Sequence, residues 1–194
     1  MALESWTASL SDPLADLVSR AQRGDRAALG ELIAQTQGRV YNLAYRILGN
    51  PQEAEDLTQE VYVRVWRALP RFRGESKFTT WLHTVATNAC LNRKRKLRRQ
   101  LDAQLDAGER LEEIAAPEEG PAQEALHHDE HARLWELVER LPDKYRLVLA
   151  LFYQQQLSYQ EIAQVLALPL GTVKAHLNRA RNALAANLKE VGIR

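Results

Sequence analysis

Apolar residues recur every three or four positions along most of this chain, which is the spacing of one face of an α-helix. The longest such stretch is 26–48, and a second runs from about residue 51 to residue 69. Strict alternation of apolar and polar residues, the pattern of a half-buried strand, is almost absent from the sequence. The hydrophobic pattern therefore predicts an all-α protein.

Short motifs mark where these helices begin and end. A Ser-Asp-Pro motif at 11–13 is expected to cap a first helix, and Gly49 is expected to end the 26–48 helix in a left-handed conformation. The Asn-Pro-Gln-Glu motif at 50–53 combines an N-cap residue, a proline in the first turn and a capping-box glutamate. It predicts the start of a third helix, and a fourth is expected over about 78–97.

Charge is distributed unevenly, although the formal net charge of the 194 residues is only +1. Residues 71–99 contain nine lysines and arginines and one acidic residue, whereas residues 101–130 contain ten acidic residues and one arginine. This segregation indicates a basic binding face followed by an acidic spacer. Two plain solvated helix faces are the alternative interpretation.

The acidic spacer divides the chain into two predicted helical domains. Prolines and a glycine at 117–121 favour a flexible linker over 99–125, between domains at 10–98 and 126–192. Three histidines in this region could suggest a metal or pH sensor: His127, His128 and His131. A solvated helix start is the favoured interpretation, because no cysteine or carboxylate cluster completes a metal site.

The last quarter of the chain has the pattern of a helix-turn-helix. A Ser-Tyr-Gln-Glu capping box at 158–161 opens a short helix, Gly171 is expected to supply a permissive turn, and Thr172 is expected to cap a second helix. The outer face of that second helix carries Lys174, His176, Asn178, Arg179 and Arg181. Such side chains donate to phosphates and base edges, so the pattern predicts duplex DNA binding. An amphipathic hairpin with a charged outer face is the alternative.

A second candidate nucleic-acid surface combines aromatic and basic residues at 71–81 with the basic end of the following helix. Aromatic rings stack on unpaired bases while lysine and arginine bind the backbone, so this mixture is typical of single-strand binding. Phe78 and Trp81 fit core packing equally well. Asn88 and Asn92 fit either base contacts or a solvated face, whereas six cations at 93–99 indicate phosphate contact.

The helix at 53–69 presents an acidic and amide face formed by Asp56, Gln59 and Glu60. Two carboxylates could suggest acid–base chemistry or a metal site, but no histidine, cysteine or further carboxylate stands at ligand spacing. A protein-docking surface or a plain solvated face is the more economical interpretation.

The remaining sequence features limit the class of protein and the compartment that can be expected. A single cysteine, Cys90, excludes an internal disulfide and fits a reducing compartment. The first residues lack the pattern of a secretory signal, and no apolar run reaches 18 residues, so we expect a soluble, cytoplasmic protein that does not insert into a membrane. No nucleophile, metal or cofactor motif is found in the sequence, which indicates a protein that is not an enzyme.

Three sequence blocks follow one another in a fixed order. They are Asp-Leu-Thr-Gln-Glu-Val-Tyr-Val-Arg-Val-Trp at 56–66, Phe-Arg-Gly-Glu-Ser-Lys-Phe-Thr-Thr-Trp-Leu at 72–82, and Leu-Ser-Tyr-Gln-Glu-Ile-Ala at 157–163 with the helix 171–181. Together they resemble a bacterial RNA polymerase sigma factor of the two-domain extracytoplasmic-function (ECF) group. The resemblance implies a sigma region 2 helical bundle in the first domain and a region 4 helix-turn-helix in the second.

The resemblance also implies roles for the first domain. In such proteins a region 2 helix docks on the clamp helices of the polymerase β′ subunit, which implies core-polymerase contacts by Asp56, Gln59, Glu60 and Val63. The same domain melts the promoter −10 element and captures its non-template strand, with the loop at 71–78 forming the pocket for a flipped base. The residues implied in −10 binding are Phe72, Arg73, Ser76, Lys77, Trp81, Asn88, Asn92 and Arg95.

Region 4 of these proteins binds the −35 element as a duplex. The residues implied in this contact are Ser158, Tyr159, Thr172, Lys174, Ala175, His176, Asn178, Arg179 and Arg181. The implied partners are core RNA polymerase, through its β′ clamp helices and β flap, promoter DNA, and an anti-sigma factor; no cofactor is implied. The alternative is a stand-alone regulator of duplex operators, because 171–177 also looks like a LuxR-type helix. The block at 50–99 lacks receiver-domain aspartates, which counts against that alternative.

Overall fold

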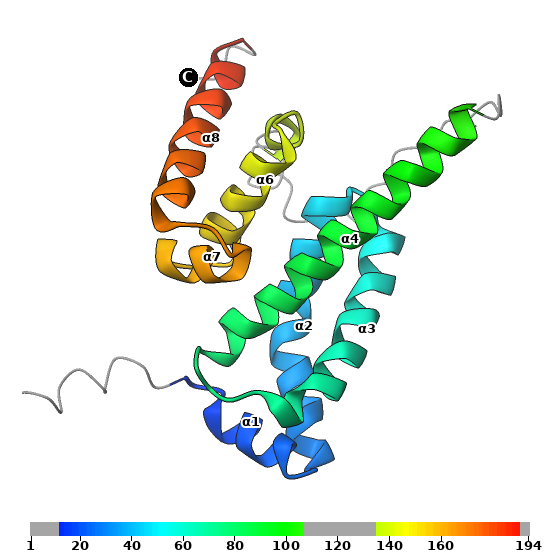
Figure 1. Ribbon diagram of the computed structural model, residues 1–194, viewed down its shortest axis with the longest axis vertical. Coiled ribbons are helices and arrows are strands. Elements are labelled where there is room, and N and C mark those ends of the chain that lie inside the picture. The colour runs from blue at the N-terminus through cyan, green and yellow to red at the C-terminus, as the bar shows by residue number, and fades with distance from the viewer. Residues whose placement is uncertain (1–11, 107–134, 191–194) are drawn as a thin grey trace, which may run out of the picture.

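The computed structural model describes residues 12–106 and 135–190, and the regular elements within these two stretches are all helical. The predicted all-α fold with two helical parts is thereby confirmed (Figure 1). The predictions for the linker beyond residue 106 and for the three histidines at 127–131 lie outside the described residues, as do the outermost residues of both predicted domains.

The first part is a bundle of three long helices with a short helix against one end. The long helices are α2 (Arg26–Leu48), α3 (Pro51–Ala68) and α4 (Phe78–Asp106). The short helix α1 (Ala15–Gln22) packs on α2 and on the 3₁₀ turn η2 (Leu69–Arg71), at the end of the bundle where α2 begins and α3 ends (Figure 1). This places α1 beside the loop that connects α3 to α4.

Capping residues set several of these boundaries, and Gly49 and Asn50 act as predicted. Asp25 accepts hydrogen bonds from the backbone N–H groups of Ala27 and Ala28 at 3.0 and 3.1 Å, and Gly49 ends α2 with φ of 72°. Asn50 Oδ1 accepts from Glu53 N at 3.0 Å, which confirms it as the N-cap of α3. The capping-box role predicted for Glu53 is wrong, because its carboxylate pairs with Arg93 of α4 (2.8 Å) and so links two helices.

The start of α1 differs from the prediction. The helix begins at Ala15 with no side-chain cap, and Asp12 stands before it. One carboxylate oxygen of Asp12 accepts from Leu14 N at 3.0 Å, and the other accepts from the backbone N–H of Phe78. Asp12 therefore satisfies an unpaired donor at the beginning of α4, 66 residues away.

The fourth helix is longer than the prediction of about 78–97. It continues to Asp106, so the first residues of the expected linker are helical. Residues 98–106 contain no glycine or proline and consist mainly of arginine, glutamine, leucine, alanine and aspartate. Most of these residue types have good helix propensity, which explains the extension.

The second part contains a helical segment at 135–139, then α6 (Asp143–Leu149), the π-helical turn η3 (Ala150–Gln154), α7 (Tyr159–Leu166) and α8 (Leu170–Glu190). The predicted capping box is confirmed, because Ser158 and Glu161 exchange hydrogen bonds at the start of α7. Helices α7 and α8 form the predicted helix-turn-helix, with Val173, Leu177 and Ala180 of α8 buried.

The predictions for the turn between α7 and α8 are wrong: Gly171 does not form the turn, and Thr172 does not cap α8. The left-handed residue is Ala167, with φ of 50°, and α8 already begins at Leu170. Thr172 N donates to Pro169 O at 2.9 Å, so Thr172 lies within the first helical turn. The fixed φ of proline suits the start of a helix, and that start is therefore earlier than a threonine cap would give.

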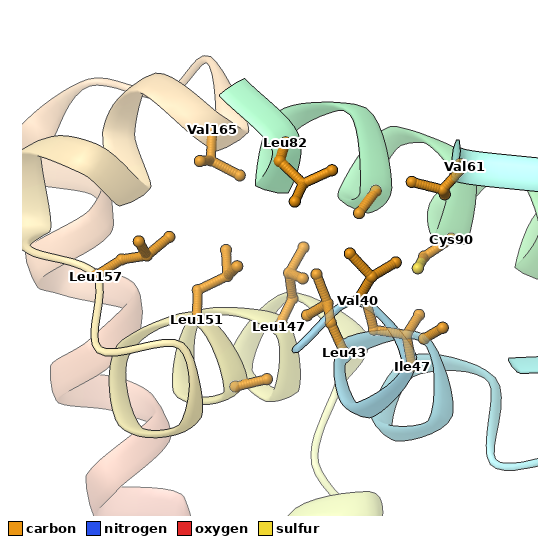
Figure 2. Close-up of a cluster of buried hydrophobic side chains, with 14 of the residues drawn as sticks. Val40, Leu43, Ile47, Val61, Leu82, Cys90, Leu147, Leu151, Leu157 and Val165 are labelled. Carbon is orange, nitrogen blue, oxygen red and sulfur yellow. The ribbon is translucent and has the colours of Figure 1, made fainter. Parts of the chain in front are cut away.

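The two helical parts share one hydrophobic core. Figure 2 shows Val40, Leu43 and Ile47 of α2 and Leu82 of α4 facing Leu147, Leu151, Leu157 and Val165 of the second part, and all of these side chains are buried. Cys90 lies in the same cluster and is completely buried, which raises the pKa of its thiol to about 12. A continuous core of this kind holds the second part against α2 and α4.

Candidate nucleic-acid and protein interfaces

The face of α3 opposite the core carries the residues expected to dock on a protein. Asp56 and Gln59 are exposed, and the exposed fractions of Val63 and Trp66 are 46 % and 60 %. Sequence reasoning missed Trp66, although it follows Val63 by three residues and stands outside the buried stripe of α3. Large apolar side chains next to polar ones on an exposed helix face are typical of an interaction surface.

Glu60 on this face is already engaged within the molecule. Its carboxylate accepts from Arg64 and, at 3.1 Å, from Arg93 Nη2. The hydrogen bond from Arg64 and the charges of both arginines hold the pKa of Glu60 below its usual value. Glu60 therefore connects α3 to α4, and its carboxylate is less available to a partner than that of Asp56.

The loop between α3 and α4 forms one wall of a pocket of about 450 Å³. The other wall belongs to α1, whose contribution the sequence did not indicate. The lining residues are Asp12, Ala15, Val18, Ser19, Gln22, Phe72, Arg73, Gly74, Glu75, Ser76 and Lys77. Gln22 Nε2 donates to the carbonyl oxygens of Leu69 at 3.0 Å and Phe72 at 2.8 Å, so this single amide holds the beginning of the loop against α1.

Three aromatic rings meet behind this loop. The ring centroids of Phe72 and Trp81 are 5.1 Å apart, and those of Phe78 and Trp81 are 5.8 Å apart. Phe78 has an exposed fraction of 1 % and belongs to the core, whereas Phe72 and Trp81 are half-buried at its edge. The loop therefore lies over a cluster of aromatic rings.

The rim of the loop is polar and partly charged. Arg73 has a side chain that is 84 % exposed and lies 3.7 Å from Glu75, while Ser76 Oγ donates to Lys77 O at 3.3 Å. Gly74 has φ of 71°, a conformation that favours glycine in this turn. The Arg73 guanidinium therefore lies in solvent near the mouth of the pocket, with only the exposed Glu75 carboxylate beside it.

A shallow basic groove of about 330 Å³ runs along α4. It is lined by Asn92, Arg95, Lys96, Arg99, Gln100 and Ala103. Arg95 Nη2 donates to Asn92 Oδ1 at 3.0 Å, and Asn88 is exposed one turn earlier on the helix. These side chains present cations and amides to solvent, as a nucleic-acid backbone requires.

Most of the α8 residues that are expected to contact duplex DNA are exposed to solvent. Lys174, Ala175, Asn178 and Arg179 are exposed, and Thr172 is half-buried. At the start of α7, Ser158 is exposed within its capping box, and Tyr159 is half-buried.

Two of the expected contacts on α8 are oriented by neighbouring aromatic residues. His176 is half-buried, its ring centroid is 6.0 Å from that of Tyr145, and its Nδ1 is buried without a hydrogen-bond partner among the described residues. Arg181 Nε donates to the Tyr153 hydroxyl at 3.0 Å, and its guanidinium lies 5.3 Å from the Phe152 ring centroid. Arg181 is therefore held in place, while His176 is turned partly towards α6.

Polar contacts also join the two parts of the molecule. His83 Nε2 lies 2.9 Å from Gln155 Oε1, and Gln155 Nε2 donates to the carbonyl oxygen of Arg39 at 3.2 Å. His83 and Gln155 are both buried, and burial lowers the pKa of His83 although its hydrogen bonds act in the opposite direction. The sequence offered no signal for this contact, because its partners are 72 residues apart.

Metal and membrane sites can be assessed for the same residues. Within 12–106 and 135–190, no three histidine, cysteine, aspartate or glutamate side chains come together as metal ligands. None of the helices in these stretches combines the length and apolar character needed to cross a membrane.

Comparison with known families assigns both parts. The model described as Sigma-70 region 2 matches residues 32–100, and the model described as Sigma-70, region 4 matches residues 131–184. The chain is 34 % identical to the ECF RNA polymerase sigma factor SigW of Bacillus subtilis over 179 residues, which cover 90 % of this chain and 96 % of SigW. It is 35 % identical to the RNA polymerase sigma-H factor of Pseudomonas aeruginosa, with coverage of 87 % and 90 %.

Solved structures share the fold. The structure of CnrH in complex with the cytosolic domain of CnrY aligns with a TM-score of 0.67 and 24 % identity, covering 90 % of this chain and 96 % of that one. The sigma factor RpoE in complex with the anti-sigma factor NepR from Bartonella quintana aligns with a TM-score of 0.66 and 23 % identity, covering 82 % and 96 %.

Proposed function

Because the chain belongs to the ECF group of RNA polymerase sigma factors, we propose that it binds core RNA polymerase and directs transcription initiation at specific promoters. The observation that carries this proposal is the 34 % identity to SigW, which extends across both parts of the chain. Sigma factors are generally non-catalytic initiation factors, so the chemistry of RNA synthesis belongs to the polymerase. The site of action is then the cytoplasm, where the polymerase works.

The first part binds the −10 element in this proposal. The pocket between α1 and the loop at 72–77 takes a nucleotide base flipped out of the duplex, and Phe72, the aromatic residue in its lining, offers a stacking surface. Arg73, Ser76 and Lys77 supply donors at the rim. Asn88, Asn92 and Arg95 extend the same surface along α4, where the exposed cations bind phosphates.

The second part binds the −35 element as a duplex. Lys174, Ala175, Asn178 and Arg179 lie on the exposed face of α8, as a recognition helix in the major groove requires. Thr172, His176 and Arg181 flank this face, and Ser158 and Tyr159 contact the backbone from the start of α7. Because His176 is packed against Tyr145, it contributes through its exposed edge only.

Two kinds of protein partner complete the proposal. The α3 face with Asp56, Gln59, Glu60 and Val63 docks on the β′ clamp helices, and the second part contacts the β flap. An anti-sigma factor is the second partner; the sigma factor RpoE of Bartonella quintana, which shares this fold, was solved in complex with the anti-sigma factor NepR. A stand-alone LuxR-like regulator is not favoured, because the region 2 family model matches 32–100.

Reconstitution with core RNA polymerase tests this function. The protein is expected to co-purify with the core enzyme and to give discrete transcripts from a promoter library that core enzyme alone does not give. Tight binding to duplex DNA without any association with polymerase would contradict the proposal and favour the stand-alone regulator.

Replacing Gln22 by methionine is expected to slow promoter opening about three- to tenfold while leaving binding of the −35 duplex unchanged. Methionine has a similar size but cannot donate the two hydrogen bonds to Leu69 O and Phe72 O, each worth about 0.5–1.5 kcal/mol. The loop wall of the pocket then loses its attachment to α1. Permanganate reactivity of −10 thymines in the holoenzyme measures opening. Gln37→Met, at an exposed position of α2, is the matched control, and equal rates for both variants would exclude this role.

A further inference from the structure

An aromatic cluster surrounds Arg181 at the edge of the exposed face of α8. Arg181 Nε donates to the Tyr153 hydroxyl at 3.0 Å, and the guanidinium lies 5.3 Å from the ring centroid of Phe152 and 5.6 Å from that of Tyr153. The ring of Phe152 packs in turn on that of Tyr159, with the centroids 5.2 Å apart. These four residues, the Arg181 cluster, join the π-helical turn η3, the start of α7 and the exposed face of α8.

The Arg181 cluster holds a positive charge without a counter-ion. Hydrogen bonding to Tyr159 and to Tyr153 raises the pKa of Arg181, and no carboxylate of the described residues lies within ion-pair distance of its guanidinium. Because the Tyr153 oxygen accepts from the guanidinium, its O–H group is left to donate to a further acceptor. The planar guanidinium also has N–H groups beyond the one bonded to Tyr153. A fixed cation next to hydroxyl donors is suited to bind an anion.

The position of the cluster indicates that this anion is a phosphate of duplex DNA. Arg181 follows Asn178 by three residues and Lys174 by seven, so it lies at the edge of the same exposed helix face. Tyr153 is 50 % exposed and stands shortly before α7. In a helix-turn-helix the middle of the recognition face reads base edges, while its edge and the start of the preceding helix meet the backbone. The fixed orientation of Arg181 favours such a backbone contact.

We propose that Tyr153 and Arg181 form a binding site for one phosphate of the duplex backbone, in which Tyr153 positions the guanidinium and donates its own O–H to the same phosphate. Phe152 supplies the aromatic surface that supports the guanidinium. The site adds affinity for duplex DNA without any preference for sequence. This inference rests on the proposed function, which makes the second part a duplex-binding module.

Replacing Tyr153 by phenylalanine tests the site with a minimal change. Tyr153→Phe keeps the ring and removes only the hydroxyl, and it is expected to weaken duplex binding by the full chain about two- to fivefold, the range of a single hydrogen bond. The probes are two labelled duplexes of different mixed sequence, and fluorescence anisotropy at low salt provides the dissociation constants. Both duplexes should show the same loss. Tyr41→Phe, at a half-buried tyrosine of α2, is the matched control and should bind as wild type does.

The salt dependence separates a phosphate contact from a structural role. Arg181→Met is expected to lower the slope of log affinity against log salt by about one, as the loss of one phosphate contact does. Arg140→Met removes the same charge at another exposed position of the second part and should leave the slope close to wild type. In the Arg181→Met background, Tyr153→Phe should cost less than in wild type, because no guanidinium is left to position. Equal slopes for the two arginine variants, an equal cost of Tyr153→Phe in both backgrounds, or a loss confined to one duplex would overturn the proposal.

The same variants keep this inference apart from the proposed function. If Tyr153→Phe and wild type bind both duplexes equally while wild type still directs transcription with core polymerase, only the phosphate site is wrong. If duplex binding changes as expected but the wild-type chain never associates with core polymerase, the phosphate site stands and the proposed function is wrong.

Discussion

Combined replacement of Asp56 by arginine and Gln59 by alanine is expected to weaken association with core RNA polymerase at least tenfold while leaving the helical fold intact. Both side chains are exposed on α3, and they stand beside the exposed apolar residues Val63 and Trp66. Removing a polar group and reversing a charge at the centre of a docking face creates like-charge or unpaired contacts, which commonly cost more than 1.4 kcal/mol. Co-purification and competition with a labelled sigma factor measure the loss.

A matched control lies on a different helix. Glu31→Arg makes the same change of charge at an exposed position of α2. It is expected to bind polymerase nearly as wild type does. Unchanged binding of the Asp56 and Gln59 double variant, with circular dichroism like wild type, would show that the docking surface lies elsewhere.

Replacing Phe78 by alanine is expected to lower the free energy of unfolding by about 3–5 kcal/mol, the usual cost of truncating a buried phenylalanine. Its side chain is 1 % exposed and packs at the start of α4 against the rings of Phe72 and Trp81. Loss of the ring leaves a cavity under the loop at 72–77. Urea denaturation followed by circular dichroism measures the change.

Trp66 provides the comparison for this experiment. It is also aromatic but is 60 % exposed, so Trp66→Ala should change the free energy of unfolding by about 0.5 kcal/mol or less. It should instead weaken polymerase binding. If Phe78→Ala lowers the free energy of unfolding by less than about 1 kcal/mol, Phe78 is not a core residue. It would then again be a candidate for contact with a nucleotide base.

The helices themselves were largely predictable, because their determinants are local. The bounds of α2 at Arg26–Leu48 follow from a repeating apolar stripe and a glycine that ends it, and Asn50 caps α3 as its motif indicates. The capping box at Ser158 and Glu161 is equally local. Each of the capping signals lies within four residues of the boundary that it sets.

Features that depend on distant parts of the chain were not predictable in the same way. Asp12 caps α4 from 66 residues away, and the contact between His83 and Gln155 spans 72 residues. Ala167, rather than Gly171, takes the left-handed conformation between α7 and α8, since packing of the two helices outweighs the preference of a single residue. No spacing rule anticipates such contacts.

The same difference between local and distant determinants applies to the candidate sites. Residue types on α4 and α8 indicated nucleic-acid surfaces, and most of the named side chains are exposed there. The wall that α1 contributes to the loop pocket, including Gln22, had no sequence signal because α1 reads only as an amphipathic helix. The inward turn of His176 likewise depends on Tyr145, which stands on a different helix.

The burial of Cys90 makes this chain convenient for site-specific labelling. The sole thiol is completely enclosed and its pKa is about 12, so maleimide reagents at neutral pH should find almost no thiolate there. Two cysteines introduced on the surface, one on α3 and one on α8, would then react without removal of the native one. Donor and acceptor dyes placed on α3 and α8 could thus follow the separation of the two parts in single molecules as the polymerase engages.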